Sequence, residues 1–305
     1  MPQFIHHEEV KGNRVQRELP NGHKQWRTDF VKAPEGQDAP QAFLAESTPK
    51  RLLRTHYHEV DQFQIIMHGG GVLGKHKLAP LGVHFTRAYT PYGPIINNDQ
   101  GIGFMTLRAR KDWGRAQYLP EKREELNAIT HRTPWQVTEL GEFVYQGDAN
   151  IYTFRQIRDE RGLGAFTLTL KPHASINAPD PTQTDGQYIV ITKGSAVYNG
   201  ASHASTSVAF VKPEDGPQKL VAGADGMEAL VLNFPRRVPV VEKALRTSTQ
   251  FKVWQCDLCA FSYDEAVGMP DEGIAAGTRW EDVPESWTCP DCSTRKSDFQ
   301  MRVVN

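Results

Sequence analysis

The four cysteines of the 305-residue chain lie close together in the sequence, in two Cys-x-x-Cys pairs. A secreted protein held by disulfides would spread its cysteines along the chain, whereas paired cysteines in an intracellular protein are typical of a metal site. Four thiolates form a closed tetrahedral set of ligands that suits iron or zinc. The spacing therefore predicts a single-ion centre, with an electron-transferring iron and a structural zinc as alternatives. Its ligands would be Cys256, Cys259, Cys289 and Cys292.

A second group of potential ligands lies in residues 54–62, which read RTHYHEVDQ. Alternate side chains of an extended strand share a face, so His56, His58 and Gln62 would point the same way. Two imidazoles and an amide oxygen would then converge. Because His-x-His pairs also occur by chance, three interpretations stay open: a metal site, a pocket for an organic ligand without metal, and a structural role.

The elements that position these groups are predicted to be β-strands. Short apolar runs such as FQIIM, GAFTLTL, QYIVIT and EALVLNF are rich in β-branched and aromatic residues and are separated by Gly and Pro. This pattern favours an antiparallel β-sandwich or barrel. Only PEKREELNAI, with Pro120 near its start, has helical character.

A weak internal repeat indicates two β units. Residues 62–69, QFQIIMHG, resemble residues 187–194, QYIVITKG, and a short segment containing Pro and Gly follows each copy. The intervals from Gln62 to Gly93 and from Gln187 to Gly216 differ by only two residues. Duplication explains two such similarities in the same order better than chance does.

The residues around the cysteines resemble rubredoxin over its full length. Trp254 stands two residues before the first cysteine, the run FSYD follows the first pair, and PDEGIAAGTRWEDVPESWTCPDC tracks the remainder. The resemblance implies iron in the four-cysteine site, with zinc as the alternative, and one-electron transfer. Ala260 and Ser293 depart from the usual glycines, where a positive φ helps the turn, and we expect them to alter hydrogen bonding to sulfur rather than the ligand set. The implied aromatic core is Trp254, Phe261, Tyr263, Trp280, Trp287 and Phe299.

His-x-His followed four residues later by Gln62 resembles the first cupin motif, and cupins are small jelly-roll barrels. The resemblance covers about residues 40–115, with a degraded copy at about 150–235. It implies an iron or another divalent metal held by His56, His58 and Gln62, with Tyr92 or His84 as the fourth ligand. Neutral glutamine in place of the more usual glutamate weakens binding of a divalent ion and makes a ferric or tyrosinate-assisted site conceivable. In the second copy Pro181 and Gln183 replace the histidines, so no metal is expected there.

The predicted fold is therefore mainly β, with two cupin-type jelly-roll barrels, the second degenerate, followed by a small rubredoxin-like domain. The predicted boundaries are 1–130, 131–241, a linker at 242–252, and 253–305. Residues 253–300 hold ten acidic and three basic residues, a net charge of −7, so the rest of the chain is +6. Opposite charges favour docking of the tail on the body or on a basic partner.

The composition excludes some functions and leaves others open. A net charge of −1 argues against nucleic-acid binding, and neither a signal-peptide pattern nor a membrane-spanning apolar run is present, so we expect a cytoplasmic protein. One hypothesis is a metal-dependent oxidoreductase or oxygenase that acts on a small organic substrate through His56, His58, Gln62 and Tyr92. Its rubredoxin would relay electrons from an external reductase, and the cupin sheets could form a homodimer. The alternatives are an electron carrier or redox sensor with a non-catalytic cupin pair, and a zinc-stabilised binding protein, so enzymatic activity stays open.

Overall fold

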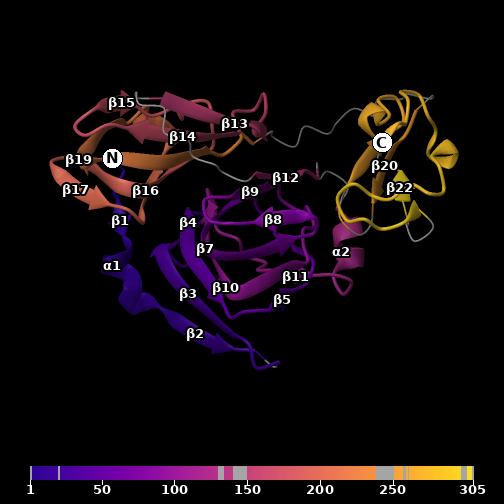
Figure 1. Cartoon of the computed structure of the whole chain (residues 1–305), viewed down its shortest axis with the longest axis horizontal. Helices are drawn as coiled ribbons and strands as arrows, with labels where there is room; N and C mark the ends of the chain where they lie inside the picture. The colour runs from indigo at the N-terminus through magenta and orange to yellow at the C-terminus, as the bar shows by residue number, and fades with distance from the viewer. Residues whose placement is uncertain are drawn as a thin grey trace.

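The computed structural model contains two stacked β-barrels and a small C-terminal domain beside them (Figure 1). It describes residues 2–19, 21–129, 134–139, 150–237, 251–256, 259, 261–296 and 301–303. The predicted linker, residues 242–252, lies outside these ranges except for its last two residues. No helix in the described ranges is long and apolar enough to cross a membrane.

The first barrel is built on one sheet in the order β12-β9-β7-β10-β4-β3-β2, with β5 paired to β10 and β8 to β7. The long central strands are apolar, and every residue of the second half of β10 is buried. A separate two-stranded ladder of β6 and β11 closes one end, near α2. The bounds are β2 Val15–Glu18, β3 Lys24–Val31, β4 Gln41–Ser47, β5 Leu52–Leu53, β6 His56–Tyr57, β7 Gln62–Leu73, β8 His76–Leu78, β9 Val83–Thr86, β10 Ile95–Arg108, β11 Gln117–Tyr118, α2 Arg123–Asn127 and β12 Gln136–Glu139.

The second barrel repeats the plan of the first, with the sheet order β1-β18-β16-β19-β14-β13 and with β15 on β19 and β17 on β16. The central strands β7 and β16 each have 12 residues. They begin at Gln62 and Gln187, the glutamines that start the two copies of the sequence repeat. The bounds are β1 Ile5–His6, α1 His7–Val10, β13 Asn150–Arg158, β14 Gly164–Leu170, β15 Ser175–Asn177, β16 Gln187–Tyr198, β17 Ala201–Ala204, β18 Ser207–Val211 and β19 Lys219–Asn233.

The two barrels share one hydrophobic core. Phe63 of the first barrel meets Phe234 of the second with ring centroids 5.1 Å apart, and both side chains are buried. Tyr188 donates a hydrogen bond of 3.0 Å to the carbonyl oxygen of Arg108, the last residue of β10. The second barrel therefore fixes the end of a strand that carries a site residue of the first.

Strand pairing crosses the boundary predicted at residue 130. β12 lies after that position and pairs with β9 of the first barrel. The N-terminal strand β1 pairs with β18 of the second barrel. Each exchange covers backbone groups that an isolated barrel would leave unpaired at its edge.

The C-terminal domain has a three-stranded sheet in which β20 lies between β21 and β22. Tyr263 and Trp287 are buried in its core, and the rings of Trp280 and Trp287 meet edge to face with centroids 5.4 Å apart. Trp254, Phe261 and Trp280 pack against this core as predicted, and Phe299 lies outside the described residues. The bounds are β20 Val253–Cys256, β21 Ser262–Asp264 and β22 Met301–Val303. The short 3-10 turns of the chain are Lys11–Asn13, Pro213–Asp215, Pro270–Glu272 and Trp280–Asp282.

The buried side chain of Glu265 links several segments of this domain by hydrogen bonds. Its carboxylate accepts hydrogen bonds from Trp254 Nε1 at 2.6 Å, from the Lys252 and Trp280 backbone N–H groups, and from Arg279 Nη1. Burial alone raises the pKa of Glu265, but these donors outweigh it and lower the pKa to about 2.

Replacing Glu265 by glutamine is expected to destabilise the C-terminal domain at neutral pH by about 2 kcal/mol, because charge-assisted hydrogen bonds are lost. The pKa of Glu265 is lower in the folded than in the unfolded protein. The stabilisation is therefore fully present above the unfolded pKa of 4.5, and it is lost as the pH falls through the folded pKa of about 2. Denaturant unfolding followed by tryptophan fluorescence measures it at neutral and at acid pH. Glu285→Gln is the control, since Glu285 is exposed. An equal loss for both variants would contradict the prediction.

Candidate functional site

The four predicted cysteines come together in one compact group. Their sulfur atoms all lie within 4.8 Å of one another, and those of Cys259 and Cys289 are 3.4 Å apart. A tetrahedral ion with metal–sulfur bonds near 2.3 Å separates its ligands by about 3.8 Å, so the spacing fits an iron or zinc ion. Across the described ranges this is the one group of three or more His, Cys, Asp or Glu side chains so arranged.

The local chemistry of the thiols favours a bound cation. Contacts with the other thiols, first with Cys256, raise the pKa of Cys259 and Cys289, since neighbouring sulfurs cannot all carry negative charge unaided. A metal ion removes this obstacle by deprotonating its ligands. Cys256, Cys259 and Cys289 are buried, and Cys292 is partly exposed.

Ser293 adopts the backbone conformation that its position demands. Its φ is +58°, in the left-handed region where glycine is usual. Its N–H still donates to the carbonyl oxygen of Cys289 at 2.8 Å, which closes the second cysteine loop. The other departure from the glycine pattern, Ala260, lies outside the described residues.

In the first barrel, the structure brings His56, Tyr92 and Gln62 into direct contact. An isolated antiparallel bridge pairs the backbones of His56 and Tyr92. His56 Nδ1 donates to the Arg54 carbonyl oxygen at 2.8 Å, so its Nε2 accepts from the Tyr92 hydroxyl at 3.0 Å. The hydroxyl in turn accepts from Gln62 Nε2 at 2.6 Å.

His58 is oriented by an acidic residue that the sequence analysis missed. Its Nδ1 lies 2.6 Å from Asp112 Oδ2, a carboxylate whose side chain is fully buried. The carboxylate holds the proton on Nδ1, as the outer partner of a ligating histidine does in many metal sites, and the Arg115 backbone also hydrogen-bonds the ring.

Arg108 is the second residue that the sequence analysis missed. It lies 3.0 Å from Asp112 through Nη1, and it donates to Gln62 Oε1 through Nε at 3.1 Å and Nη2 at 2.9 Å. Gln62, predicted to ligate a metal through this oxygen, thus gives the oxygen to Arg108 and its amide hydrogen to Tyr92. The available signal for Arg108 was a charged residue at the end of the apolar run of residues 101–107.

His84 lies on the same side of the barrel, with its ring centroid 5.1 Å from that of Tyr92. Its Nδ1 is 2.9 Å from Thr138 Oγ1, while its Nε2 is buried without a hydrogen-bond partner. A buried nitrogen of this kind needs an ordered water, an ion or a ligand as its partner.

The protonation states suit metal binding or hydrogen bonding. Burial lowers the pKa of His56 and of His84 to about 3, so both imidazoles are neutral at physiological pH. Burial also lowers the pKa of His58 and raises that of Tyr92 above its usual range, so the phenol keeps its proton. Three neutral imidazoles and a phenol match the ligand chemistry of a first-row transition metal. The match is one of donor chemistry, because among the described residues only the four cysteines are already gathered closely enough to hold an ion.

Comparison with known proteins assigns the C-terminal domain. Residues 253–299 match the rubredoxin family model. The chain is 65% identical over 48 residues to Rubredoxin-2 of Pseudomonas aeruginosa, spanning 16% of this chain and 87% of that protein. It is 54% identical over 59 residues to Rubredoxin-2 of Rhodococcus erythropolis, spanning 19% of this chain and 94% of that protein. This assignment supports iron in the four-cysteine site.

The two barrels resemble solved structures at low sequence identity. A candidate dioxygenase of Nostoc punctiforme superposes with a TM-score of 0.51 at 15% identity, covering 79% of this chain and 85% of the other. A mutant of the oxalate decarboxylase of Bacillus subtilis gives 0.50 at 11% identity and covers 78% of each chain. At these identities the likeness shows the fold alone. The predicted fold class, two cupin-type barrels followed by a rubredoxin-like domain, is confirmed.

Proposed function

Because this chain belongs to the rubredoxin family through its C-terminal domain, we propose that it is an oxygenase-type oxidoreductase whose four-cysteine iron delivers single electrons to the first barrel. The substrate is a small organic molecule bound beside His56, His58 and Tyr92, and dioxygen is the terminal acceptor. The observation that most supports this is the buried network in which His84 Nε2 has no hydrogen-bond partner and His56 Nε2 accepts from the Tyr92 hydroxyl. Electrons come from an external reductase, in the reducing environment of the cytoplasm.

The residues of the first barrel have separate roles in this proposal. A transition-metal ion held by His56, His58 and His84, with the Tyr92 hydroxyl released from His56 Nε2, would supply Lewis-acid and one-electron chemistry. Tyr92 keeps its proton and donates it as a hydrogen bond, so it can orient a substrate oxygen or give up a proton. Gln62 fixes the phenol, and Arg108 fixes Gln62 through its two hydrogen bonds.

Metal counting tests the proposal. The purified protein is expected to be red from ferric-thiolate absorption and to hold about two metal ions per chain, because both donor sets bind transition metals. A His56→Ala/His58→Ala variant should lose one ion and keep the red colour. His173→Ala, at an exposed position, is the matched control. A colourless protein with a single zinc would refute electron transfer.

A second candidate function is an electron carrier or redox sensor whose barrels bind a ligand without catalysis. The engagement of Gln62 Oε1 by Arg108 favours it, because the amide oxygen is then withdrawn from metal binding. One metal ion per chain in both the wild type and the His56→Ala/His58→Ala variant would support this candidate over the first.

A further inference from the structure

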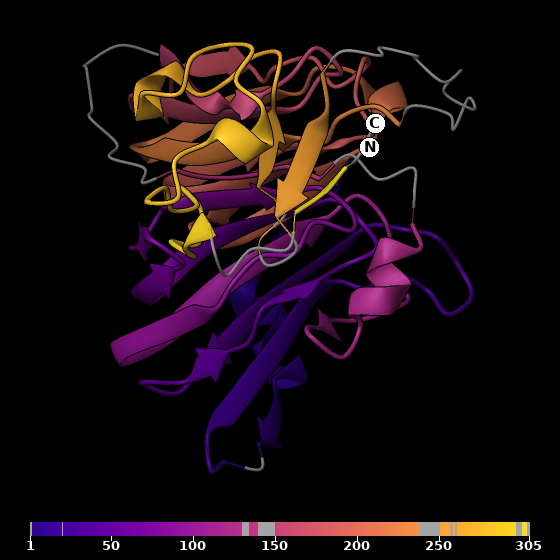
Figure 2. The ribbon, with the colours of Figure 1, turned by 90° about the vertical axis from the view of Figure 1, so that its right-hand side faces the viewer.

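Strand β12 lies between the four-cysteine centre and the site of the first barrel. Figure 2 looks onto the C-terminal domain, which lies in front of the barrels, and Figure 1 shows β12 beside it. The strand is held in the first barrel by pairing of Gln136 with Thr86 and of Thr138 with His84 on β9. Residues of β12 can therefore touch both metal-binding regions.

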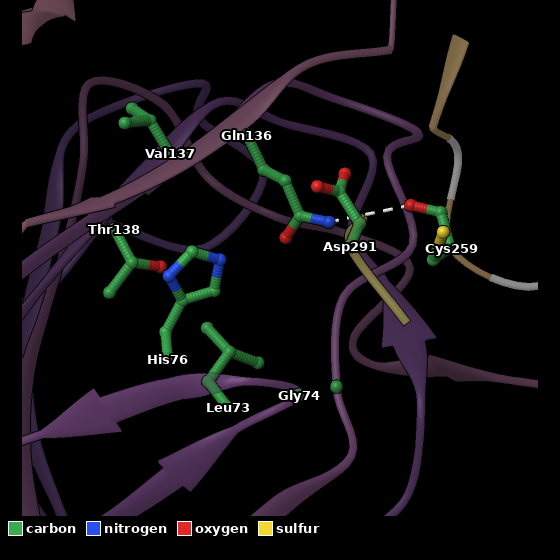
Figure 3. Close-up of a pocket in the computed structure, with 9 residues that line it drawn as sticks. Leu73, Gly74, His76, Gln136, Val137, Thr138, Cys259 and Asp291 are labelled. Atoms are coloured by element: carbon green, nitrogen blue, oxygen red, sulfur yellow. Dashed lines mark hydrogen bonds between the residues drawn. The ribbon is translucent and has the colours of Figure 1, made fainter. Parts of the chain in front are cut away.

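Gln136 makes this double contact through a single nitrogen. Its Nε2 donates one hydrogen to the carbonyl oxygen of Cys259 at 3.3 Å and the other to the carbonyl oxygen of Pro91 at 3.4 Å. Figure 3 shows the amide reaching from β12 towards Cys259. Both hydrogens of the amide are used, so the side chain is held between the two carbonyl groups.

The two carbonyl groups belong to residues that adjoin the two sites. Cys259 is a ligand of the four-cysteine centre. Pro91 is bonded to Tyr92, whose backbone N–H donates to the carbonyl oxygen of His56 at 3.0 Å. Covalent bonds and hydrogen bonds thus run without a break from the iron ligand, through Gln136 and Tyr92, to the imidazole. Electron tunnelling through such a path is faster than across an empty gap.

The surfaces of the first barrel and the C-terminal domain also lie close together around this contact. His76, Gln136, Thr138, Cys259 and Asp291 line a small pocket between the barrel and the C-terminal domain (Figure 3). Gly74 borders it, and a Cβ atom on that residue would lie 3.1 Å from the Asp291 carbonyl oxygen. The hairpin between β7 and β8 therefore leaves little space between the two surfaces.

We propose that Gln136 is a positioning residue that fixes the four-cysteine centre on the first barrel and forms the route by which the electron crosses. The proposal rests on the function proposed above. One electron leaves the ferrous centre, which becomes ferric, and is taken up in the first barrel, where His56, His58 and His84 would hold a transition-metal ion able to accept it on the way to dioxygen. No bond forms or breaks at Gln136, and no proton moves there.

Nuclear magnetic resonance tests the position of Gln136 without any turnover. In the full-length protein with ferric iron, the side-chain NH₂ signal of Gln136 is expected to be broadened, whereas with diamagnetic zinc in the cysteine site it is sharp. The NH₂ signal of Gln100, an exposed residue of β10 that does not line the pocket at Cys259, should be sharp in both forms. Equal Gln136 signals in the two forms would overturn the proposal.

Rapid mixing tests the route. The ferrous protein is mixed with dioxygen, and the return of ferric-thiolate absorption is timed in the wild type, Gln136→Leu, Gln100→Leu and His56→Ala/His58→Ala. Gln136→Leu should be several-fold slower than the wild type, because a hydrogen-bonded link in the coupling path is replaced by a gap between non-bonded atoms. Gln100→Leu should match the wild type. Oxidation by ferricyanide, which can reach the partly exposed Cys292 directly, should be equal in all four proteins.

The outcomes separate this proposal from the one on which it rests. If the double-histidine variant is slow but Gln136→Leu is as fast as the wild type, the electron reaches the imidazole site by another route and only the role of Gln136 is refuted. If the double-histidine variant is as fast as the wild type, electrons do not pass through that site, and the proposed function fails as well. If Gln136→Leu also slows with ferricyanide, the substitution has damaged the iron centre itself, and the role as a bridge is refuted.

Discussion

Replacing Cys289 by serine is expected to unfold the C-terminal domain while both barrels stay folded. The domain is too small to be held by its apolar core alone, because domains of this size gain only a few kcal/mol from burial. Binding of a metal by four thiolates contributes about 10–16 kcal/mol in comparable small sites, and that free energy is folding free energy. Cys289 is 1% exposed, so its loss leaves a buried gap in the ligand shell that water cannot fill.

Tryptophan spectroscopy measures this effect cleanly, because three of the six tryptophans lie in the C-terminal domain. Trp254, Trp280 and Trp287 pack around the core there, so their near-ultraviolet circular dichroism should disappear in Cys289→Ser. The thermal transition of the barrels should stay within a few degrees of the wild type. Ser293→Gly, which changes the same loop but keeps all four ligands, is the control and should keep the signal. A folded C-terminal domain in Cys289→Ser would contradict the prediction.

The four-cysteine centre could be predicted from the sequence because its ligands are specified locally. Each Cys-x-x-Cys pair forms its own loop, and the aromatic residues that pack around it lie within the same stretch of chain. The strand pattern and the repeat were readable for a similar reason, since alternation and glycine positions are properties of short segments.

The interior of the first barrel could be predicted only in part. His56 and His58 stood out by spacing, and Tyr92 was found through the resemblance to a motif. Asp112 and Arg108 were not found, because Asp112 meets His58 across 54 positions of sequence and no local pattern encodes that meeting. The position of Arg108 depends on the second barrel, because Tyr188 of that barrel donates a hydrogen bond to the carbonyl oxygen of Arg108.

Gln136 illustrates the same limit. It lies in a short polar strand after the predicted boundary of the first barrel, and nothing in its neighbours marks it. The role proposed for it rests on pairing with β9 and on a contact with a residue 123 positions away. The opposite charges of tail and body predicted docking of the tail on the body or on a basic partner, and they pointed to no particular residue.

Replacing Asp112 by alanine is expected to destabilise the first barrel by about 3–5 kcal/mol, because it leaves the buried charge of Arg108 without its partner. Arg108 is 6% exposed, and burial already lowers its pKa, so the guanidinium depends on this carboxylate. The same change frees the Nδ1 proton of His58, and we expect metal binding at the imidazole site to weaken by 10- to 100-fold, roughly the effect of removing a carboxylate partner from a ligating histidine. Urea unfolding and metal titration measure the two effects separately.

Two control variants distinguish the cost of leaving Arg108 unpaired from the cost of simply removing an aspartate side chain. Asp99→Ala breaks an exposed ion pair with Lys50 and should cost less than about 1 kcal/mol. The double variant Arg108→Met/Asp112→Leu removes both charges and should recover most of the stability, since a well-packed apolar pair can replace a buried ion pair. It should not recover metal affinity, because His58 still lacks its carboxylate. If the double variant is as unstable as Asp112→Ala, the loss comes from packing around Gln62 and Tyr92 rather than from the unpaired charge.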